Sequence, residues 1–239
     1  MVQRPKLSEM TTPQRKDQPH HVSGEAAFGP DTEILEEILE PGINICNWQR
    51  TLPGYVQADL VAWTQTLTER VDVQLKRGSP VPPAALAGLA GPTRDWLVAD
   101  LASLSARYMH LAQANPIRFS FGPVNRTQCP KFHVDHIALR LLCTYVGPGT
   151  EWLPEHALRR SALAKRSAST IADNAKLLVD AAALQRAQPG NVLVMKGERF
   201  GDGTPGVVHR SPAIEASGLT RLVLTLSVMP SPNPPKHSR

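Results

Sequence analysis

The feature that most constrains the fold is a series of short β-rich runs in the second half of the chain. These runs follow Pro116, and glycine or proline lies near most of their ends. They comprise residues 117–121, 137–146, 191–196, 206–210 and 221–228. Short strands bounded by turn residues are typical of a β-sandwich or barrel, whereas regular alternation with helices would indicate a parallel sheet. The sequence therefore predicts a β core over about 116–230.

The last run has two faces of different chemistry. In a strand, alternate side chains share a face. One face carries Leu222, Leu224, Leu226 and Val228, and the other carries Arg221, Val223, Thr225 and Ser227. The aliphatic face requires a helical layer to cover it. Because buried charges persist mainly when they are paired, Arg221 requires either an anionic ligand inside the barrel or a structural salt bridge to Glu198 or Glu215.

The first half of the chain has helical periodicity. Apolar residues recur at intervals of three and four over 31–40, 56–77 and 93–114, and a Gly/Pro-rich loop covers 78–92. Residues 154–187 return to helical character between the predicted strands. The sequence thus predicts an α+β fold with a helical N-terminal layer (about 29–115) and a helical insertion in the β core. We expect one domain over 29–230, flanked by disordered tails at 1–28 and 231–239.

Composition excludes several classes of function. The chain has 239 residues, a net charge of +5 and basic residues that are spread out, so nucleic-acid binding is not expected. Three cysteines without a C-x-x-C pair argue against a disulfide framework and a zinc knuckle. The N-terminus lacks the apolar segment of a secretory signal, and no apolar run approaches the roughly 20 residues that span a bilayer. We expect a cytoplasmic protein that does not enter a membrane.

Ionisable side chains gather at the start of the 137–146 run. His133 and Asp135 share a face of an extended chain, so they converge, whereas His136 points away. A further histidine, His209, lies in the fourth run. Two histidines and one carboxylate with open positions are the facial triad of non-haem iron(II) oxygenases. The alternatives are a pair of capped strand ends with a core histidine, or weak metal binding by the His20-His21 pair; Cys129 is a possible fourth ligand or a buried thiol.

The order of these residues resembles that of a known superfamily. An F-H-x-D motif, a strand, a G-x-x-H motif and an arginine twelve residues later resemble the iron(II)/2-oxoglutarate dioxygenases of the double-stranded β-helix (jelly-roll) fold. The phrases FHVDHIALRLLCTYVGPGTEWLP, VMKGE and VHRSPAI resemble an uncharacterised bacterial family known as a domain of unknown function, with members in zinc-related gene neighbourhoods. The resemblance covers about 30–230. The arginine spacing is slightly longer than usual in the superfamily, and Val223 stands where a serine is usual.

The resemblance implies roles for particular residues. His133, Asp135 and His209 would bind iron(II), and Arg221 would bind the distal carboxylate of 2-oxoglutarate. Further candidates on the co-substrate side are Tyr145, with a packed core tyrosine as the alternative, and Thr225. Candidates on the substrate side are Thr150, Glu151, Trp152 and Lys196, of which Lys196 could instead form an ion pair.

The function implied is a metal-dependent oxidoreductase that hydroxylates a substrate the sequence does not identify. A non-redox divalent-metal protein that holds zinc in metal homeostasis is the alternative, and a cupin-like hydrolase or isomerase is a third possibility. The sequence does not specify the oligomeric state.

Overall fold

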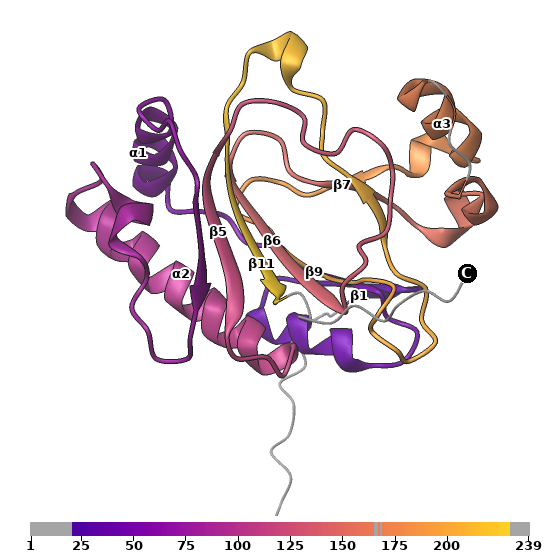
Figure 1. Cartoon of the computed structure of the whole chain (residues 1–239), viewed down its shortest axis with the longest axis horizontal. Coiled ribbons are helices and arrows are strands. Elements are labelled where there is room, and N and C mark those ends of the chain that lie inside the picture. The colour runs from indigo at the N-terminus through magenta and orange to yellow at the C-terminus, as the bar shows by residue number, and fades with distance from the viewer. Residues whose placement is uncertain (1–20, 165–166, 168, 230–239) are drawn as a thin grey trace, which may run out of the picture.

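The computed structural model describes residues 21–229 except 165, 166 and 168, and consists of two β-sheets with helices packed around them (Figure 1). The large sheet has eight strands and the small sheet has three. Most neighbouring strands are antiparallel, but β2 and β3 are parallel, so the large sheet is mixed. In sheet order, the large sheet contains β1 (His21–Ser23), β2 (Ala26–Gly29), β3 (Ile45–Trp48), β9 (Val192–Lys196), β6 (Leu139–Val146), β11 (Arg221–Val228), β5 (Ile117–Val124) and β4 (Val71–Leu75).

The small sheet and the helices complete the α+β fold. The small sheet contains β10 (Val208–Arg210), β7 (Glu151–Leu153) and β8 (Gln185–Arg186). The α-helices are α1 (Gly54–Thr64), α2 (Gly91–Leu111) and α3 (Thr170–Leu177). Short 3-10 helices are η1 (Thr32–Leu39), η2 (Pro83–Leu86), η3 (Glu155–Ala157), η4 (Arg160–Ala162), η5 (Ala181–Ala183) and η6 (Glu215–Ser217). Helices α1 and α2 lie along one side of the large sheet, and α3 lies at the far end of the molecule (Figure 1).

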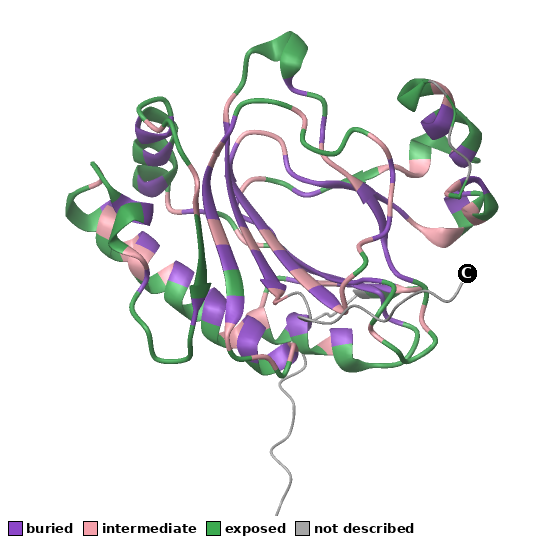
Figure 2. Ribbon diagram, viewed as in Figure 1, coloured by how far each residue is buried: buried purple, intermediate pink, exposed green. Residues whose placement is uncertain are grey.

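The main core lies between the large sheet and helices α1 and α2. Leu222, Leu224 and Leu226 of β11 are fully buried in the same apolar cluster as Leu60 of α1 and Leu101 of α2. This confirms that the aliphatic face of the last strand packs against a helical layer. Each fully buried leucine contributes roughly 1.5–3 kcal/mol of transfer free energy, so β11 is anchored firmly on this side. Its opposite face is left to line the space between the sheets, where buried and half-buried segments of both sheets face each other (Figure 2).

The prediction of one long helix over 56–77 is wrong in its second half. Helix α1 ends at Thr64, and Val71–Leu75 forms β4 at the edge of the large sheet, paired with β5. Val71 fits a helical spacing from Leu67, but Val71 and Val73 also alternate with polar residues as a strand requires, and pairing with β5 decides between the two. The N-terminal half is therefore not only helical, since it supplies strands β1 to β4.

The helical prediction over 154–187 is also largely wrong. Within the described part of this insertion, only Thr170–Leu177 forms an α-helix, and the rest is 3-10 turns, bends and the short strand β8. Alanine, leucine and lysine give the stretch helical propensity, but serine and aspartate side chains bond to nearby backbone groups and interrupt it. Asp180, for example, accepts a hydrogen bond from the N–H of Ala182 and starts a 3-10 turn soon after α3 ends, while Ser169 accepts from the N–H of Ala172 and limits α3 at its start.

Part of the segment expected to be a disordered tail forms strands. Strand β1 and all of β2 except Gly29 lie within residues 1–28, and the two strands extend the large sheet at its edge. The His20-His21 pair and the 231–239 tail lie outside the residues whose side chains are described. The single domain over 29–230 stays a prediction. No described helix is long and apolar enough to cross a bilayer.

Candidate metal centre

Three side chains from two separate segments converge between the sheets. The Nε2 atom of His133 lies 3.8 Å from Oδ1 of Asp135, and the Nε2 atom of His209 lies 3.6 Å from Oδ2 of the same carboxylate. One donor atom from each of the three residues lies within 4.8 Å of the others. The two imidazole rings are 4.5 Å apart between centroids. A single divalent cation needs donors at about 2.0–2.2 Å from one centre, so the side chains require only small rotations to bind it.

The backbone holds the two histidines beside each other. The N–H of His133 donates to the carbonyl of His209 at 3.0 Å, and the N–H of His209 donates back to the carbonyl of His133 at 3.0 Å. This isolated antiparallel bridge extends the small sheet beyond β10. Residues far apart in the sequence thus become direct cross-strand neighbours, whose side chains lie on one face.

The second ring nitrogen of each histidine is fixed by a carbonyl. Nδ1 of His133 lies 3.0 Å from the carbonyl oxygen of Lys131, and Nδ1 of His209 lies 3.1 Å from that of Val207. A carbonyl can only accept, so each Nδ1 carries the proton and donates it, and each Nε2 keeps its lone pair for a metal. Burial lowers the pKa of His209 to about 4, although Asp135 acts in the opposite direction. His209 is therefore a neutral imidazole at pH 7, as a metal ligand must be.

Asp135 is held ionised. Burial acts to raise its pKa, but His209 and Arg140 outweigh burial and leave the pKa below its ordinary value. Arg140 of β6 donates from Nε to Oδ2 and from Nη2 to Oδ1, the latter at 3.1 Å. His136 lies outside the cluster, exposed and paired with Glu198 at 2.6 Å, which confirms that it points away. Arg140 was not predicted from the sequence, although an arginine that interrupts the apolar run 137–146 is a signal that could have identified it.

A cavity of about 470 Å³ extends from these three residues between the sheets. The inner face of β11 forms part of its wall, as the alternation of the last strand predicted. Besides His133, Asp135 and His209, its lining includes Arg70, Arg118, Ser120, Arg140, Thr150, Arg210, Arg221, Val223, Thr225 and Ser227. Arg118, Arg140 and Arg210 each pair with an acidic side chain. No ion pair of Arg70 or Arg221 occurs among the described residues, so these two guanidinium groups favour an anionic ligand.

Arg221 is buried in this wall without a carboxylate partner among the described residues. It is 3% exposed, Nη2 donates to Oγ1 of Thr144 at 3.1 Å, and Nε has no acceptor in the part of the chain that the structure describes. Burial and the neighbouring Arg70 lower its pKa to about 10, with an opposing contribution from Glu151. The salt bridges considered from the sequence do not form, because Glu198 pairs with His136 and Glu215 bonds to Thr127.

Arg70 is a second cavity cation, and it was not predicted from the sequence. Its guanidinium donates to the carbonyl of Gly122 at 3.0 Å, to Oγ of Ser120 at 3.1 Å and to the carbonyl of Val223 at 3.3 Å. Burial lowers its pKa, with Asp72 opposing. A side chain on Gly122 would lie 2.8 Å from the Cα atom of Arg70, so the glycine permits this close approach. The predicted helix over 56–77 placed Arg70 within a helix and away from the β core, so Arg70 was not expected to line the cavity.

The remaining co-substrate candidates lie in different surroundings. Thr225 lines the cavity, as does Thr150, which was predicted on the substrate side. Tyr145 is fully buried on the helix side of the large sheet, where its hydroxyl donates to Asp100 at 2.6 Å and its ring packs edge-on against Phe121. This position matches the packed tyrosine that was the alternative.

The other substrate-side candidates are held by internal contacts. Glu151 is 3% exposed and accepts from Arg186 and, at 2.7 Å, from Arg210. Trp152 lies in an apolar cluster with Leu193 and Met195. Lys196 is buried and donates from Nζ to Asp202 at 2.5 Å and to the carbonyl of Glu40 at 3.0 Å. The exposed thiol of Cys129 lines the cavity but is not one of the three clustered donors.

Fold and site together define an α+β protein whose large mixed sheet and small sheet enclose a cavity with a two-histidine, one-carboxylate donor set. The chain belongs to the family described as "Protein of unknown function (DUF1826)", whose model matches residues 29–227. This confirms the resemblance to a domain of unknown function. A search of curated proteins gives no match.

Solved structures that this chain resembles include a bacterial and a fungal protein. One is a prolyl-4-hydroxylase from Pseudomonas putida, with 11% identity, a TM-score of 0.40, and coverage of 82% of this chain and 98% of that one. Another is a full-length protein from Neurospora crassa in complex with alpha-KG, with 12% identity, a TM-score of 0.38, and coverage of 75% of this chain and 65% of that one.

Proposed function

We propose that this protein is an iron(II)- and 2-oxoglutarate-dependent dioxygenase that hydroxylates a substrate not yet identified. The observation that carries the proposal is that one cavity contains both a two-histidine, one-carboxylate donor set and a buried arginine without a carboxylate partner among the described residues. The first component suits iron(II) and leaves open coordination positions. The second suits a carboxylate. A chelating co-substrate with a distal carboxylate satisfies both at once.

The strand order supports a double-stranded β-helix core. The large sheet contains the contiguous set β5, β11, β6 and β9, and the small sheet contains the His133 bridge, β10, β7 and β8. Along the chain these strands pass between the sheets so that the last, β11, lies between the first two of the large set. When the His133 bridge is counted as a strand, each set has four members, and two facing antiparallel sets of four with such crossovers form a jelly roll. In this arrangement His133 in the bridge and His209 in β10 place their side chains in the interior.

The residues present fit a bound iron(II) ion. Two Nε2 lone pairs and one carboxylate face a common point, and the second nitrogen of each histidine is held in the required tautomer. When bound, iron(II) supplies the redox chemistry with dioxygen, while the protein binds and orients the reactants. Arg140 holds the Asp135 carboxylate, which keeps an ionised ligand in the site. Arg221, with Arg70 beside it, forms the positive end of the cavity for the distal carboxylate, and Thr225 offers a hydroxyl on the same strand face.

A zinc-binding protein without redox chemistry is the second candidate. Imidazole nitrogen and carboxylate oxygen are equally suitable ligands for zinc. The observation that favours it is that Arg221 already donates to Thr144, so a structural role for this arginine does not need a co-substrate.

We further propose a cytoplasmic location. Cys46, Cys129 and Cys143 are free thiols, and burial raises the pKa of Cys143 to about 11. Unpaired thiols are usual in a reducing compartment.

The test is anaerobic reconstitution of the purified full chain with iron(II) and 2-oxoglutarate. We expect a visible charge-transfer absorption band that requires both additions, followed by succinate release when dioxygen is admitted. The Asp135→Ala variant should show neither signal. Wild-type protein that binds iron(II) without the band or succinate release would refute the dioxygenase proposal and favour the zinc-binding candidate.

A further inference from the structure

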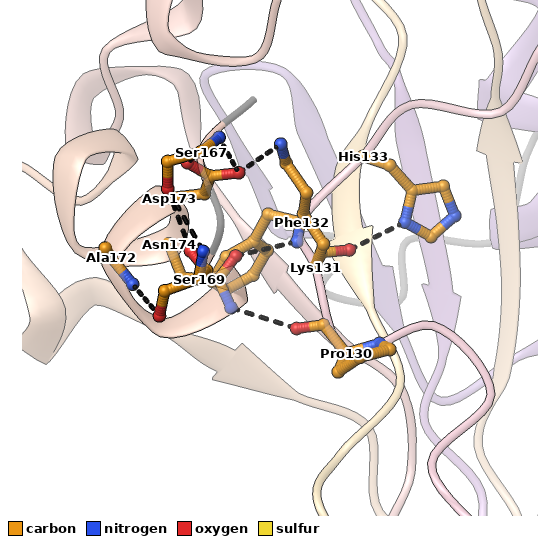
Figure 3. Close-up of polar contacts among 9 residues, drawn as sticks. All are labelled: Pro130, Lys131, Phe132, His133, Ser167, Ser169, Ala172, Asp173 and Asn174. Carbon is orange, nitrogen blue, oxygen red and sulfur yellow. Dashed lines mark hydrogen bonds and ion pairs between the residues drawn. The ribbon is translucent and has the colours of Figure 1, made fainter. Parts of the chain in front are cut away.

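Helix α3 contacts the peptide segment that immediately precedes His133. Nδ2 of Asn174 donates to the carbonyl of Pro130 at 2.9 Å, and the N–H of Phe132 donates to Oδ1 of Asn174 at 3.0 Å (Figure 3). Asn174 is 7% exposed, and its bond from Phe132 is buried while its bond to Pro130 is partly buried. One side-chain amide therefore binds a donor and an acceptor two residues apart, which fixes the course of the segment between them.

The residue between these two anchors provides the carbonyl that orients the metal ligand. Nδ1 of His133 donates to the carbonyl of Lys131, and the dashed line in Figure 3 marks this contact. The same lysine donates from Nζ to Asp173, next to Asn174 in α3, at 2.7 Å. Two consecutive residues of α3 thus hold the segment on both sides of the carbonyl that fixes the His133 ring.

Helix α3 is itself seated firmly. Ser169 caps its N-terminus, and Asp173 accepts the N–H of Ser167 at 3.0 Å. Leu177, at the other end of the helix, is 2% exposed in an apolar cluster with Phe132 and Val208, the residue before His209. Because α3 packs against both segments that carry the histidines, its contacts can hold those segments in place.

We infer that Asn174 is a positioning residue for the metal centre. It sets the peptide 130–132, the Lys131 carbonyl then sets the ring plane and tautomer of His133, and Nε2 is directed to the point shared with Asp135 and His209. Groups that orient a metal ligand without touching the metal typically change metal affinity by about 10- to 100-fold when removed. The inference rests on the metal centre of the proposed function but not on the redox chemistry, and it assigns a purpose to the insertion that carries α3.

Asn191 offers a matched control. It is also 7% exposed, its Oδ1 accepts from the N–H of Gln188 at 3.0 Å, and its Nδ2 donates to the carbonyl of Arg50 at 3.3 Å. Replacing either asparagine with alanine therefore removes two side-chain-to-backbone hydrogen bonds made by a buried amide. Both hydrogen-bond partners of Asn191 lie outside the segment 130–133, and Asn191 is not among the described residues that line the cavity.

The experiment titrates Co(II) into the full chain and follows its visible absorption spectrum, with unfolding by urea measured in parallel. We expect Asn174→Ala to weaken Co(II) binding by about 10- to 100-fold and to alter the spectrum, because the peptide that orients the His133 ring is no longer held. Asn191→Ala should shift the urea midpoint comparably and leave Co(II) binding within about twofold, since it removes no such contact. If Asn174→Ala does not fold, Asn174→Ser, which can restore one of the two bonds, should give an intermediate loss.

Two different failures are distinguishable. Wild-type affinity and spectrum in a folded Asn174 variant, or equal losses in the Asn174 and Asn191 variants, would overturn the positioning role alone. Co(II) binding that is insensitive to His133→Ala would remove the metal centre itself, and with it both this inference and the proposed function.

Discussion

Replacement of Arg221 by methionine separates a dioxygenase from a metal-holding protein. Methionine keeps much of the length and apolar bulk of arginine but removes the charge and the donors. The wild-type guanidinium is 3% exposed, and no carboxylate in the described part of the chain neutralises it. A charge-assisted contact between this group and a ligand carboxylate contributes about 1.5–3 kcal/mol. We therefore expect Arg221→Met to bind 2-oxoglutarate about 10- to 150-fold more weakly, since 1.4 kcal/mol corresponds to tenfold.

The assay measures two affinities separately by anaerobic calorimetry. Iron(II) binding should be unchanged in Arg221→Met, because Arg221 is not one of the three clustered donors. The control is Arg118→Met, which also removes a cavity-lining guanidinium. Arg118 is half-exposed and paired with Asp72 at 2.5 Å, so its loss should change 2-oxoglutarate affinity by no more than about threefold, as for other surface ion pairs.

The reasoning is refuted by wild-type 2-oxoglutarate affinity in the Arg221→Met variant. It is also refuted by equal losses in the Arg221 and Arg118 variants, which would mean that the cavity attracts anions only through its overall charge.

The remaining predictions concern the metal, pH and packing. His133→Ala should abolish stoichiometric Co(II) binding, measured by titration against a competing chelator, and unchanged binding would place the metal elsewhere. In metal-free protein, His209 has a folded pKa of about 4, so between about pH 4 and its ordinary value of about 6.5 only the unfolded chain takes up the proton. Urea unfolding should therefore show about 2 kcal/mol less stability at pH 4.5 than at pH 7 from this residue, and His209→Gln should lose that part of the dependence. Gly149→Ala should lower the melting temperature, because its new Cβ would lie 2.2 Å from the carbonyl oxygen of Ala187, whereas Gly54→Ala meets open space and should not. Equal melting temperatures for the two glycine variants would contradict this packing argument.

The sequence predicted the structure best where a local pattern was compatible with only one secondary structure. The alternation in 221–228 predicted β11 with the correct first and last residues. Four apolar and four other residues that strictly alternate indicate a strand, with one face in the core and the other on the cavity. His133 and Asp135 are two residues apart, so the alternation of side chains along an extended chain also placed these two on one face. The position of His209 beside them depended on the family order of motifs and not on local periodicity.

Long-range pairing explains what the sequence did not predict. Whether Val71 continues a helix or starts a strand depends on the open edge of β5, which the local sequence around Val71 does not contain. Arg70 reaches the cavity only because that pairing occurs. Similarly, Asn174 lies in a weakly patterned insertion, and its two bonds to Pro130 and Phe132 become visible only when α3 is seated beside the segment that carries His133.

The reciprocal backbone bridge between His133 and His209 has a thermodynamic consequence. These bonds join main-chain atoms and require no metal, so the donor set is assembled by folding of the sheets and not by the ion. The binding free energy is then not consumed in organising the chain, in contrast to small zinc domains that fold only when loaded. Stripping the ion with a chelator should leave a folded protein, whose stability rises again with added ion in proportion to RT ln(1 + [ion]/Kd). A metal ion bound by these three residues would therefore exchange without unfolding the protein, and its occupancy would follow the free concentrations of the competing ions.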